Sequence, residues 1–142
     1  MAMDDPYDLE RFVEAQRGVY EQACAELRRG RKTGHWMWFI FPQIAGLGMS
    51  AMSQRFAIGS LGEARAYLGH SILGPRLKGI CEIVLGIEGR TAEEIFGWPD
   101  DVKLRSSMTL FAAASGDELL FVEVLGKYFG GERDEKTVGM VR

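Results

Sequence analysis

Apolar side chains in the N-terminal part of the chain recur every three or four residues, which is the spacing of one face of an α-helix. Charged side chains fill the positions between them. Asp8 stands at the expected N-cap and Gly30 at the expected C-terminal end, where Arg28 and Arg29 suit the helix dipole. The pattern predicts one long amphipathic helix, with a buried face of Leu9, Phe12, Val13, Val19, Tyr20, Ala23, Cys24 and Leu27.

Capping signals and helix-breaking residues divide the rest of the chain into further helices. Ser or Thr followed three residues later by Glu has the spacing of a capping box, and proline favours the first turn of a helix. The predicted starts are Ser60, Gly74-Pro75, Thr91, Trp98-Pro99-Asp100-Asp101 and Asp117. The last four of these helices are predicted to end at Leu85, Gly97, Ser115 and Gly130-Gly131.

We therefore expect an all-α fold, a compact single-domain bundle of about six to eight helices with irregular packing. The domain spans residues 1–142, with a helical core at 7–130 and a polar C-terminal tail at 131–142. The charged residues of the tail either form a turn, held by an ion pair of Arg133 with Asp134 or Glu132, or are solvated. No alternation long enough for a sheet and no internal repeat is found.

The stretch from His35 to Gln43 departs from the helical pattern because it is dense in aromatic side chains. It reads HWMWFIFPQ and holds two of the three tryptophans and two of the eight phenylalanines. Aromatic and β-branched residues suit a strand, so Trp36 to Phe41 is a candidate local strand that Pro42 would limit. Each large aromatic side chain buries on the order of 150–250 Å². The segment therefore either fills the core or floors a pocket.

Composition and charge narrow the classes of function. The chain has 142 residues, 46% of them apolar, which suffices for one core. Its 17 basic and 20 acidic residues give a net charge of -3, which disfavours binding to duplex nucleic acid. The N-terminal segment lacks the regions of a secretory signal, and no apolar run is long enough to span a membrane. We expect a cytoplasmic protein with no membrane contact.

Metal and cofactor sites are not expected. Cys24 and Cys81 each lie singly within a helical pattern, so we expect reduced thiols that pack as small apolar side chains. The two cysteines and two histidines are too scattered for a metal motif. The glycines of Gly46-Leu47-Gly48 match neither a Walker loop nor a dinucleotide-binding fingerprint.

The chain contains several distinctive stretches, namely 8–12 with Gln16, 32–43, 46–48 with Ser50, 98–104 with Ser106-Ser107, 109–111, and 129–134 with Thr137. Together they resemble an uncharacterised bacterial family of compact, all-helical, single-domain cytosolic proteins. The resemblance covers nearly the whole chain and implies a helical architecture, but the role of that family is itself unknown. Some members carry the name calpastatin. Animal calpastatins are disordered inhibitors, whereas the aromatic content of this chain is that of a folded domain. Phe56 stands where similar proteins often have Tyr.

Two polar residues of the aromatic stretch are candidate site residues. His35 is the candidate catalytic residue, because an imidazole with an unperturbed pKa of about 6.5 acts as an acid or base near neutral pH. In the alternative interpretation its ring bonds to a neighbouring carbonyl and packs on tryptophan. Gln43 either recognises the polar edge of a ligand or caps a turn.

The glycine-rich turn after Gln43 is a candidate anion site. Gly46-Leu47-Gly48, followed by Ser50 and Ser53, would direct backbone N–H groups at an anion if a helix starts nearby. The alternative is an ordinary loop. Asp100 and Asp101 are most simply a complement to a helix dipole, since a catalytic carboxylate pair would need a pocket.

Lys103, Ser106 and Ser107 lie three or four residues apart. On a helix they share a face that presents an ammonium and two hydroxyls to a phosphate or carboxylate. Arg105 and Thr109 belong to the same segment. Hydroxyl residues are poor helix formers, so their place in mid-helix needs an explanation. The alternative explanation is a helix–helix contact that requires small side chains.

Two interpretations of function remain. In the first, these motifs converge on one pocket for a small anionic or nucleotide-like ligand, with Trp36 or Trp38 stacking on a ring. Its polar contacts come from His35, Gln43, Ser50, Lys103, Ser106 and Ser107, and catalysis would be an extension of this binding. In the second, the tryptophans are core residues and the domain is a protein-interaction or regulatory module. Exposure of the tryptophans distinguishes the two, while reaction type and oligomeric state stay open.

Overall fold

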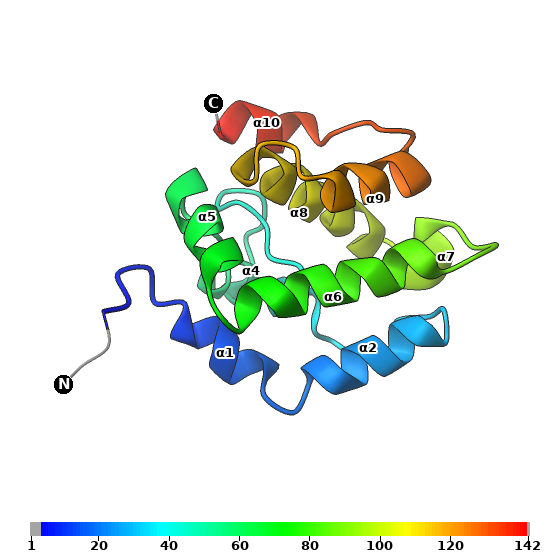
Figure 1. Ribbon diagram of the computed structural model, residues 1–142, viewed down its shortest axis with the longest axis horizontal. Coiled ribbons are helices and arrows are strands. Elements are labelled where there is room, and N and C mark those ends of the chain that lie inside the picture. The colour runs from blue at the N-terminus through cyan, green and yellow to red at the C-terminus, as the bar shows by residue number, and fades with distance from the viewer. Residues whose placement is uncertain (1–3, 142) are drawn as a thin grey trace.

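The computed structural model describes residues 4–141, and every regular element in that range is a helix (Figure 1). Ten helices are present there, six of them of at least seven residues, so the predicted all-α class is confirmed. Residues 1–3 and 142, which end the predicted domain and tail, lie outside the described range. The helices are α1 (Glu10–Gln16), α2 (Tyr20–Arg28), α3 (Met37–Ile40), α4 (Ala51–Arg55), α5 (Leu61–Gly69), α6 (Leu73–Gly86), α7 (Ala92–Phe96), α8 (Asp100–Ala114), α9 (Leu119–Phe129) and α10 (Glu135–Met140).

The longest of these helices, α8, is the centre of the fold. It packs against α5, α7, α9 and α10, while α6 crosses the front of the molecule and contacts α2, α5 and α9 (Figure 1). Nine of the fifteen residues of α8 are buried, including Ser106, Ser107 and Thr109. Small side chains on a buried face let neighbouring helices approach closely. The hydroxyl residues in mid-helix therefore serve helix packing, whatever else they do.

The first predicted helix is in fact two helices, α1 and α2. The chain turns between them at Gly18, where φ is +75°, after an extended Arg17. Glycine adopts this left-handed conformation without the Cβ clash of other residues. The apolar periodicity continues across the turn because both helices bury their apolar faces in the same core. Periodicity alone therefore hides the break.

Local capping signals locate two helix starts correctly. The hydroxyl of Ser60 accepts a hydrogen bond from the backbone amide of Glu63, at the start of α5. Thr91 and Glu94 form the full reciprocal capping box of α7. Both motifs depend on only four consecutive residues, so their outcome is set by the local sequence.

Two other predicted starts are displaced, and a third is confirmed. Asp8 has φ of +52° and lies in a turn, and the carboxylate of Asp5 instead accepts from the backbone amides at the start of α1. Asp117 likewise has a positive φ of 64°, and the amide that precedes α9 donates to the hydroxyl of Ser115. In both cases a neighbouring residue takes the capping role because the predicted residue lies elsewhere in the turn. Helix α6 begins at Leu73, so Pro75 lies in its first turn, as predicted.

The aromatic stretch forms a single helical turn, α3, and not a strand. Trp36 is 1% exposed and Phe41 is fully buried, with ring centroids 6.2 Å apart. Phe41 in turn packs edge-on against Phe96 of α7. No neighbouring strand is available in the described helical fold, so the backbone of this stretch satisfies its hydrogen bonds within its own turn.

The predicted polar tail contains the last helix, α10. The carboxylate of Asp134 caps it by accepting hydrogen bonds from the amide and hydroxyl of Thr137, at 3.0 and 2.6 Å. Thr137 is fully buried. The amide of Asp134 donates to the hydroxyl of Thr109 on α8, at 2.9 Å. The solvated end that the composition suggests is thus corrected: α10 docks on the central helix.

A buried carboxylate anchors the aromatic stretch. Glu26 of α2 is 1% exposed, and its Oε1 accepts hydrogen bonds from the amides of Thr33 and Gly34 and from the indole of Trp36, at 2.8 to 3.0 Å. Oε2 accepts from the side-chain amide nitrogen of Gln22. Burial by itself raises the pKa of Glu26, but these hydrogen bonds outweigh it and lower the pKa to about 2.

We expect Glu26 to make the stability of the protein fall in acid. The pKa of the folded state lies below the ordinary value of 4.5, so its contribution is fully present above about pH 4.5 and is lost as the pH falls toward 2. Glu26→Gln should lower the free energy of unfolding at pH 7 by on the order of 3 kcal/mol and remove most of this pH dependence. Urea titrations across this pH range measure both effects, and Glu21→Gln, on the exposed side of α2, should change neither. An unchanged acid profile in Glu26→Gln would contradict the assignment.

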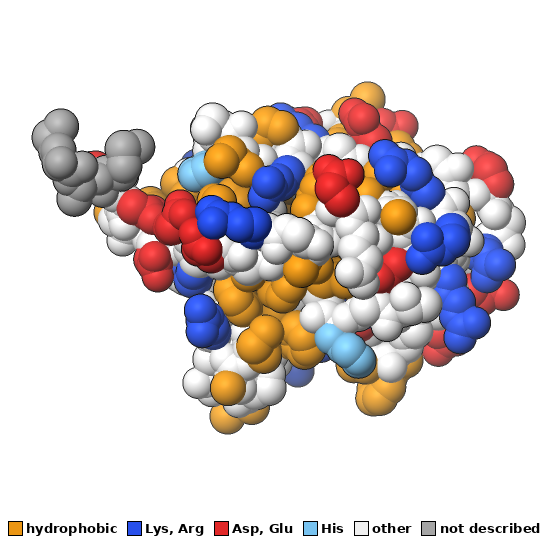
Figure 2. All heavy atoms as spheres, turned by 90° about the horizontal axis from the view of Figure 1, so that it is seen from below, with side chains coloured by type: hydrophobic (Ala, Val, Ile, Leu, Met, Phe, Trp, Pro, Cys, Tyr) orange, Lys and Arg blue, Asp and Glu red, His pale blue; other side chains and the backbone are white. Residues whose placement is uncertain are grey.

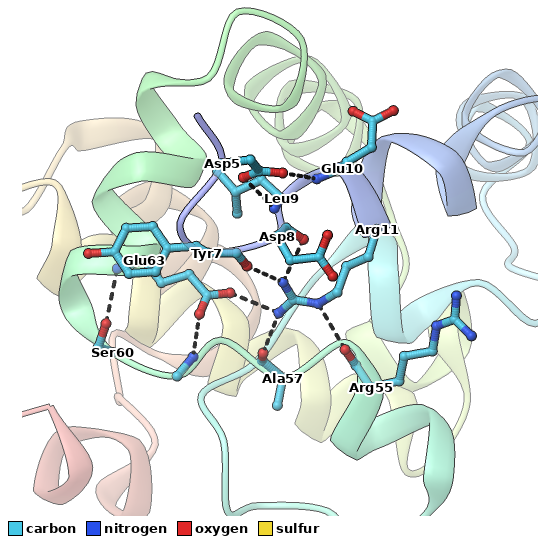
Figure 3. A network of polar contacts seen from close by, with 11 residues as sticks. Asp5, Tyr7, Asp8, Leu9, Glu10, Arg11, Arg55, Ala57, Ser60 and Glu63 are labelled. Carbon is cyan, nitrogen blue, oxygen red and sulfur yellow. Dashed lines mark hydrogen bonds and ion pairs between the residues drawn. The ribbon is translucent and has the colours of Figure 1, made fainter. Parts of the chain in front are cut away.

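A second polar network joins α1 to the segment between α4 and α5 (Figure 3). The guanidinium of Arg11 donates to the carbonyls of Tyr7, Asp8, Arg55 and Ala57 and pairs with Glu63 at 2.8 Å. Its side chain is 14% exposed. Because its donors are directed at protein acceptors, this arginine is structural and is not available to a ligand.

Replacing Arg11 should therefore reduce stability. Lysine offers a point charge and cannot reproduce the planar fork of donors, so Arg11→Lys should cost about 1–3 kcal/mol in the free energy of unfolding. Arg17 lies next to the same helix, but its pair with Glu14 is largely exposed, and Arg17→Lys should change stability by less than about 0.5 kcal/mol. Urea denaturation of the two variants compares them directly, and equal effects would refute the structural role.

Candidate functional site

A hollow of about 730 Å³ lies between the segment after α3, the first half of α8 and the start of α10. The three walls come from parts of the chain that are far apart in sequence. Lining residues come from four of the stretches that resemble the bacterial family, namely 32–43, 46–48, 98–104 with Ser106, and 129–134. The residues that line the hollow are Gln43, Leu47, Gly48, Ser53, Pro99, Val102, Lys103, Arg105, Ser106, Glu132, Arg133, Asp134, Glu135 and Lys136.

The α8 wall of the hollow carries two cations. The ammonium of Lys103 lies 5.2 Å from the ring centroid of Trp38 and 3.5 Å from one carboxylate oxygen of Asp100. The other oxygen of Asp100 binds Lys32 at 2.7 Å. Lys103 therefore has a fixed position, because an aromatic face and a carboxylate both hold its charge.

Arg105 is the second cation of this wall. Its Nε is buried and has no hydrogen-bond partner among the described residues, and its guanidinium lies 5.9 Å from the ring centroid of Phe129. Two other buried side-chain atoms, on Asp101 and Ser107, are also without a partner in that part of the chain, and all three belong to α8. Buried polar atoms are nearly always hydrogen-bonded, so unpartnered ones need an explanation. Of the three residues, Arg105 is the one that lines the hollow.

The opposite wall, at residues 132–136, has mixed charge. Arg133 pairs with Asp117 at 2.9 Å, which replaces the ion pair predicted within the 132–134 triplet. The carboxylate of Asp134 is used by the cap of α10. Lys136 also lines the hollow, together with two glutamates. An anion is therefore better accommodated against α8 than against this wall.

Neutral polar groups complete the hollow. The hydroxyl of Ser106 donates to the carbonyl of Val102 and keeps its lone pairs as acceptors. Gln43 accepts a hydrogen bond from Ile58 at its backbone carbonyl, while its side-chain amide bonds to no described residue. That amide is thus a free donor and acceptor at the wall.

A smaller niche of about 140 Å³ adjoins the hollow. Its aromatic walls are Trp38 and Phe56, and Ile44 and Leu47 add aliphatic surface. The niche and the hollow are neighbours, because four residues line both of them. These residues are Gln43, Leu47, Gly48 and Ser53.

The structure brings several of the predicted site residues together. Lys103, Ser106 and Gln43 line the hollow, and Trp38 with Gln43 lines the niche. Ser50 lies beside this region and caps α4, because its hydroxyl accepts from the amide of Ser53 and bonds to its hydroxyl. Ser50 lines neither space, and its role as an anion ligand stays a prediction.

Three predicted residues lie elsewhere. His35 is exposed, bonds to no described side chain or carbonyl, and lines neither the hollow nor the niche. Trp36 fills the core at 1% exposure, and Ser107 is fully buried inside the bundle. Stacking of a ligand on Trp36 would require the core to open, so that interpretation is corrected. None of the three lines the hollow or the niche.

Sequence reasoning missed Arg133 and Lys136 as lining residues because it assigned both to a polar tail outside the helical core. One signal was available. Asp134 precedes Thr137 by three residues, which is the spacing of an N-cap that accepts from the third amide of a helix. That spacing predicts α10, and the docking of α10 then places both cations at the hollow.

Overall charge does not mark the site. Figure 2 shows one face of the molecule, where Lys and Arg are interspersed with Asp and Glu and hydrophobic side chains gather between them. Local arrangement must therefore decide where an anion binds. Within residues 4–141, no three histidine, cysteine or acidic side chains are grouped to hold a metal ion. No helix of that range has the length and apolar character needed to cross a bilayer.

Comparisons with known proteins identify a family. A family model described as a protein of unknown function (DUF1810) matches residues 6–141. The crystal structure of the conserved hypothetical protein Rv1873 from Mycobacterium tuberculosis is 55% identical in sequence, with a TM-score of 0.95 over 96% of this chain and 98% of that one. No curated protein matches. The resemblance seen in the sequence is confirmed, and the chain belongs to the DUF1810 family of proteins of unknown function.

Proposed function

We propose that the protein binds a small organic anion in the hollow, with the anionic group held against α8 by Lys103 and Arg105. Gln43 supplies neutral hydrogen bonds to the part of the ligand outside the anionic group, and the lone pairs of Ser106 accept from a hydroxyl or amine of the ligand. A phosphate or carboxylate suits this set, because ammonium and guanidinium groups form charge-assisted bonds with either. The volume of about 730 Å³ is within the range of small-molecule sites.

The observation that carries this proposal is the state of Arg105. The buried Nε of Arg105 has lost its hydration and has no partner among the described residues, so this cation lacks the compensation that buried polar groups normally have, and a negative charge in the hollow would supply an electrostatic one. Its neighbours strengthen the case. Lys103 is held in place by Trp38 and Asp100 before any ligand arrives, so little ordering is needed on binding.

A protein partner is the second candidate, and one observation favours it. Trp98, just before α8, is 75% exposed, and Val102, in the first turn of α8, is 39% exposed. Exposed indoles are enriched in the centres of protein interfaces. Val102 also lines the hollow, so a protein segment that docks here would cover the anion site.

Phosphorylated metabolites should raise the melting temperature of the protein. A ligand at 100 times its dissociation constant adds about 2.7 kcal/mol, which corresponds to a shift on the order of 8 °C for a domain of this size. Lys103→Met and Arg105→Met should each abolish most of the shift. Arg65→Met is the matched control, because Arg65 is exposed on α5 and lines neither space.

Two outcomes would count against the anion site. One is a set of shifts that both α8 variants retain. The other is the absence of a shift with any phosphate or carboxylate compound, combined with a protein partner whose binding depends on Trp98→Ala. Circular dichroism of each variant shows whether the fold is kept.

A further inference from the structure

The niche beside the hollow has the size of one aromatic ring. Its volume is about 140 Å³. An apolar cavity of about 150 Å³ accommodates one benzene molecule, so a single six-membered ring fills a space of this size, and a fused ring system would extend beyond it. The aromatic walls add a second match, since planar rings bind well against indole and phenyl faces.

The ring niche and the anion site are joined through one side chain. Lys103 lines the hollow, and its ammonium lies 5.2 Å from the centroid of Trp38, which lines the niche. An anionic group bound at Lys103 therefore lies within a short covalent linker of a ring placed beside Trp38. One ligand with both parts spans the two spaces.

The wall between the two spaces is built for close approach. A Cβ on Gly48 would come within 2.5 Å of the hydroxyl of Ser53, so this position accepts no side chain while Ser53 keeps its place. Gly46 has φ of +100°, which lets the loop turn around the niche. The two glycines therefore let the loop run close to Ser53 at the boundary that the niche and the hollow share.

Gln43 lines both spaces, and its side-chain amide has no partner among the described residues. A primary amide presents one acceptor and two donor hydrogens. These complement the alternating donors and acceptors on the edge of a heterocycle. A hydrocarbon ring would fill the niche but leave this amide unused.

From these features we infer that the ligand of the site is an anion that carries a single planar ring, with the ring in the niche between Trp38 and Phe56 and the anionic group against Lys103 and Arg105. The heterocycle of a pyrimidine-type nucleotide has this chemistry. This inference rests on the proposed function, and it adds the class of ligand to it.

Three probes test the inference by calorimetric titration: inorganic phosphate, phenyl phosphate and 1-naphthyl phosphate. Phenyl phosphate should bind at least about fivefold more tightly than inorganic phosphate, which is the lower limit for stacking one ring on aromatic side chains. Naphthyl phosphate should gain nothing over phenyl phosphate, because its second ring exceeds the niche.

Variants that fill the niche separate the ring from the anion. Ala57→Leu should reduce the affinity for phenyl phosphate to that for inorganic phosphate and leave inorganic phosphate unchanged. Ala45→Leu fills the same niche from the other side of the loop, in case the first variant folds poorly. Ala51→Leu is the matched control, because Ala51 is exposed on α4 and lines neither space.

Gln43→Met tests the polar edge of the ring. It should weaken uridine 5′-monophosphate by about fivefold or more, the cost of one or two lost hydrogen bonds, and leave phenyl phosphate unchanged. Equal effects on both probes would refute recognition of a heterocycle edge.

The failures of the two proposals are distinguishable. If phenyl phosphate binds no more tightly than inorganic phosphate, or if naphthyl phosphate binds more tightly than phenyl phosphate, the single-ring inference is wrong and the anion site stands. If none of the three probes binds, the proposed function fails and the inference fails with it.

Discussion

The buried carboxylate of Glu26 is the constraint on which the rest of the structure depends. It satisfies the amides that follow α2 and the indole of Trp36, and so fixes the start of the aromatic stretch inside the core. Lys32, within the same segment, then binds Asp100 at the start of α8. This ion pair joins the first and second halves of the chain next to Lys103, on the α8 wall of the hollow.

In this arrangement the aromatic stretch both fills the core and lines a niche. Side chains along a helical turn point in different directions, and Trp36, the N-cap residue of α3, lies two positions before Trp38. Trp36 enters the core, whereas Trp38 reaches the niche and receives the ammonium of Lys103 on its ring. Helix α3 is only four residues long, and so short a helix is stable only when it packs against the rest of the protein. Large side chains that enter the core supply this packing.

Features that depend on a few adjacent residues could be predicted from the sequence, and those that depend on distant contacts could not. The caps at Ser60 and Thr91 are local and were predictable, as was the shared helical face of Lys103 and Ser106. The break at Gly18 was hidden because α1 and α2 pack on the same core. The docking of α10 depends on a hydrogen bond between Asp134 and Thr109, which are 25 residues apart in the sequence. This docking places residues 132–136 at the hollow.

The three tryptophans occupy three different environments, which gives this protein a built-in optical probe. Trp36 is buried beside a carboxylate, Trp98 is 75% exposed to water, and Trp38 faces the niche with a lysine on its ring. Indole emission responds to polarity and to nearby quenching groups, so each residue contributes a separate spectral component. Occupancy next to Trp38 is thus readable without any label, against one internal reference in the core and another in solvent.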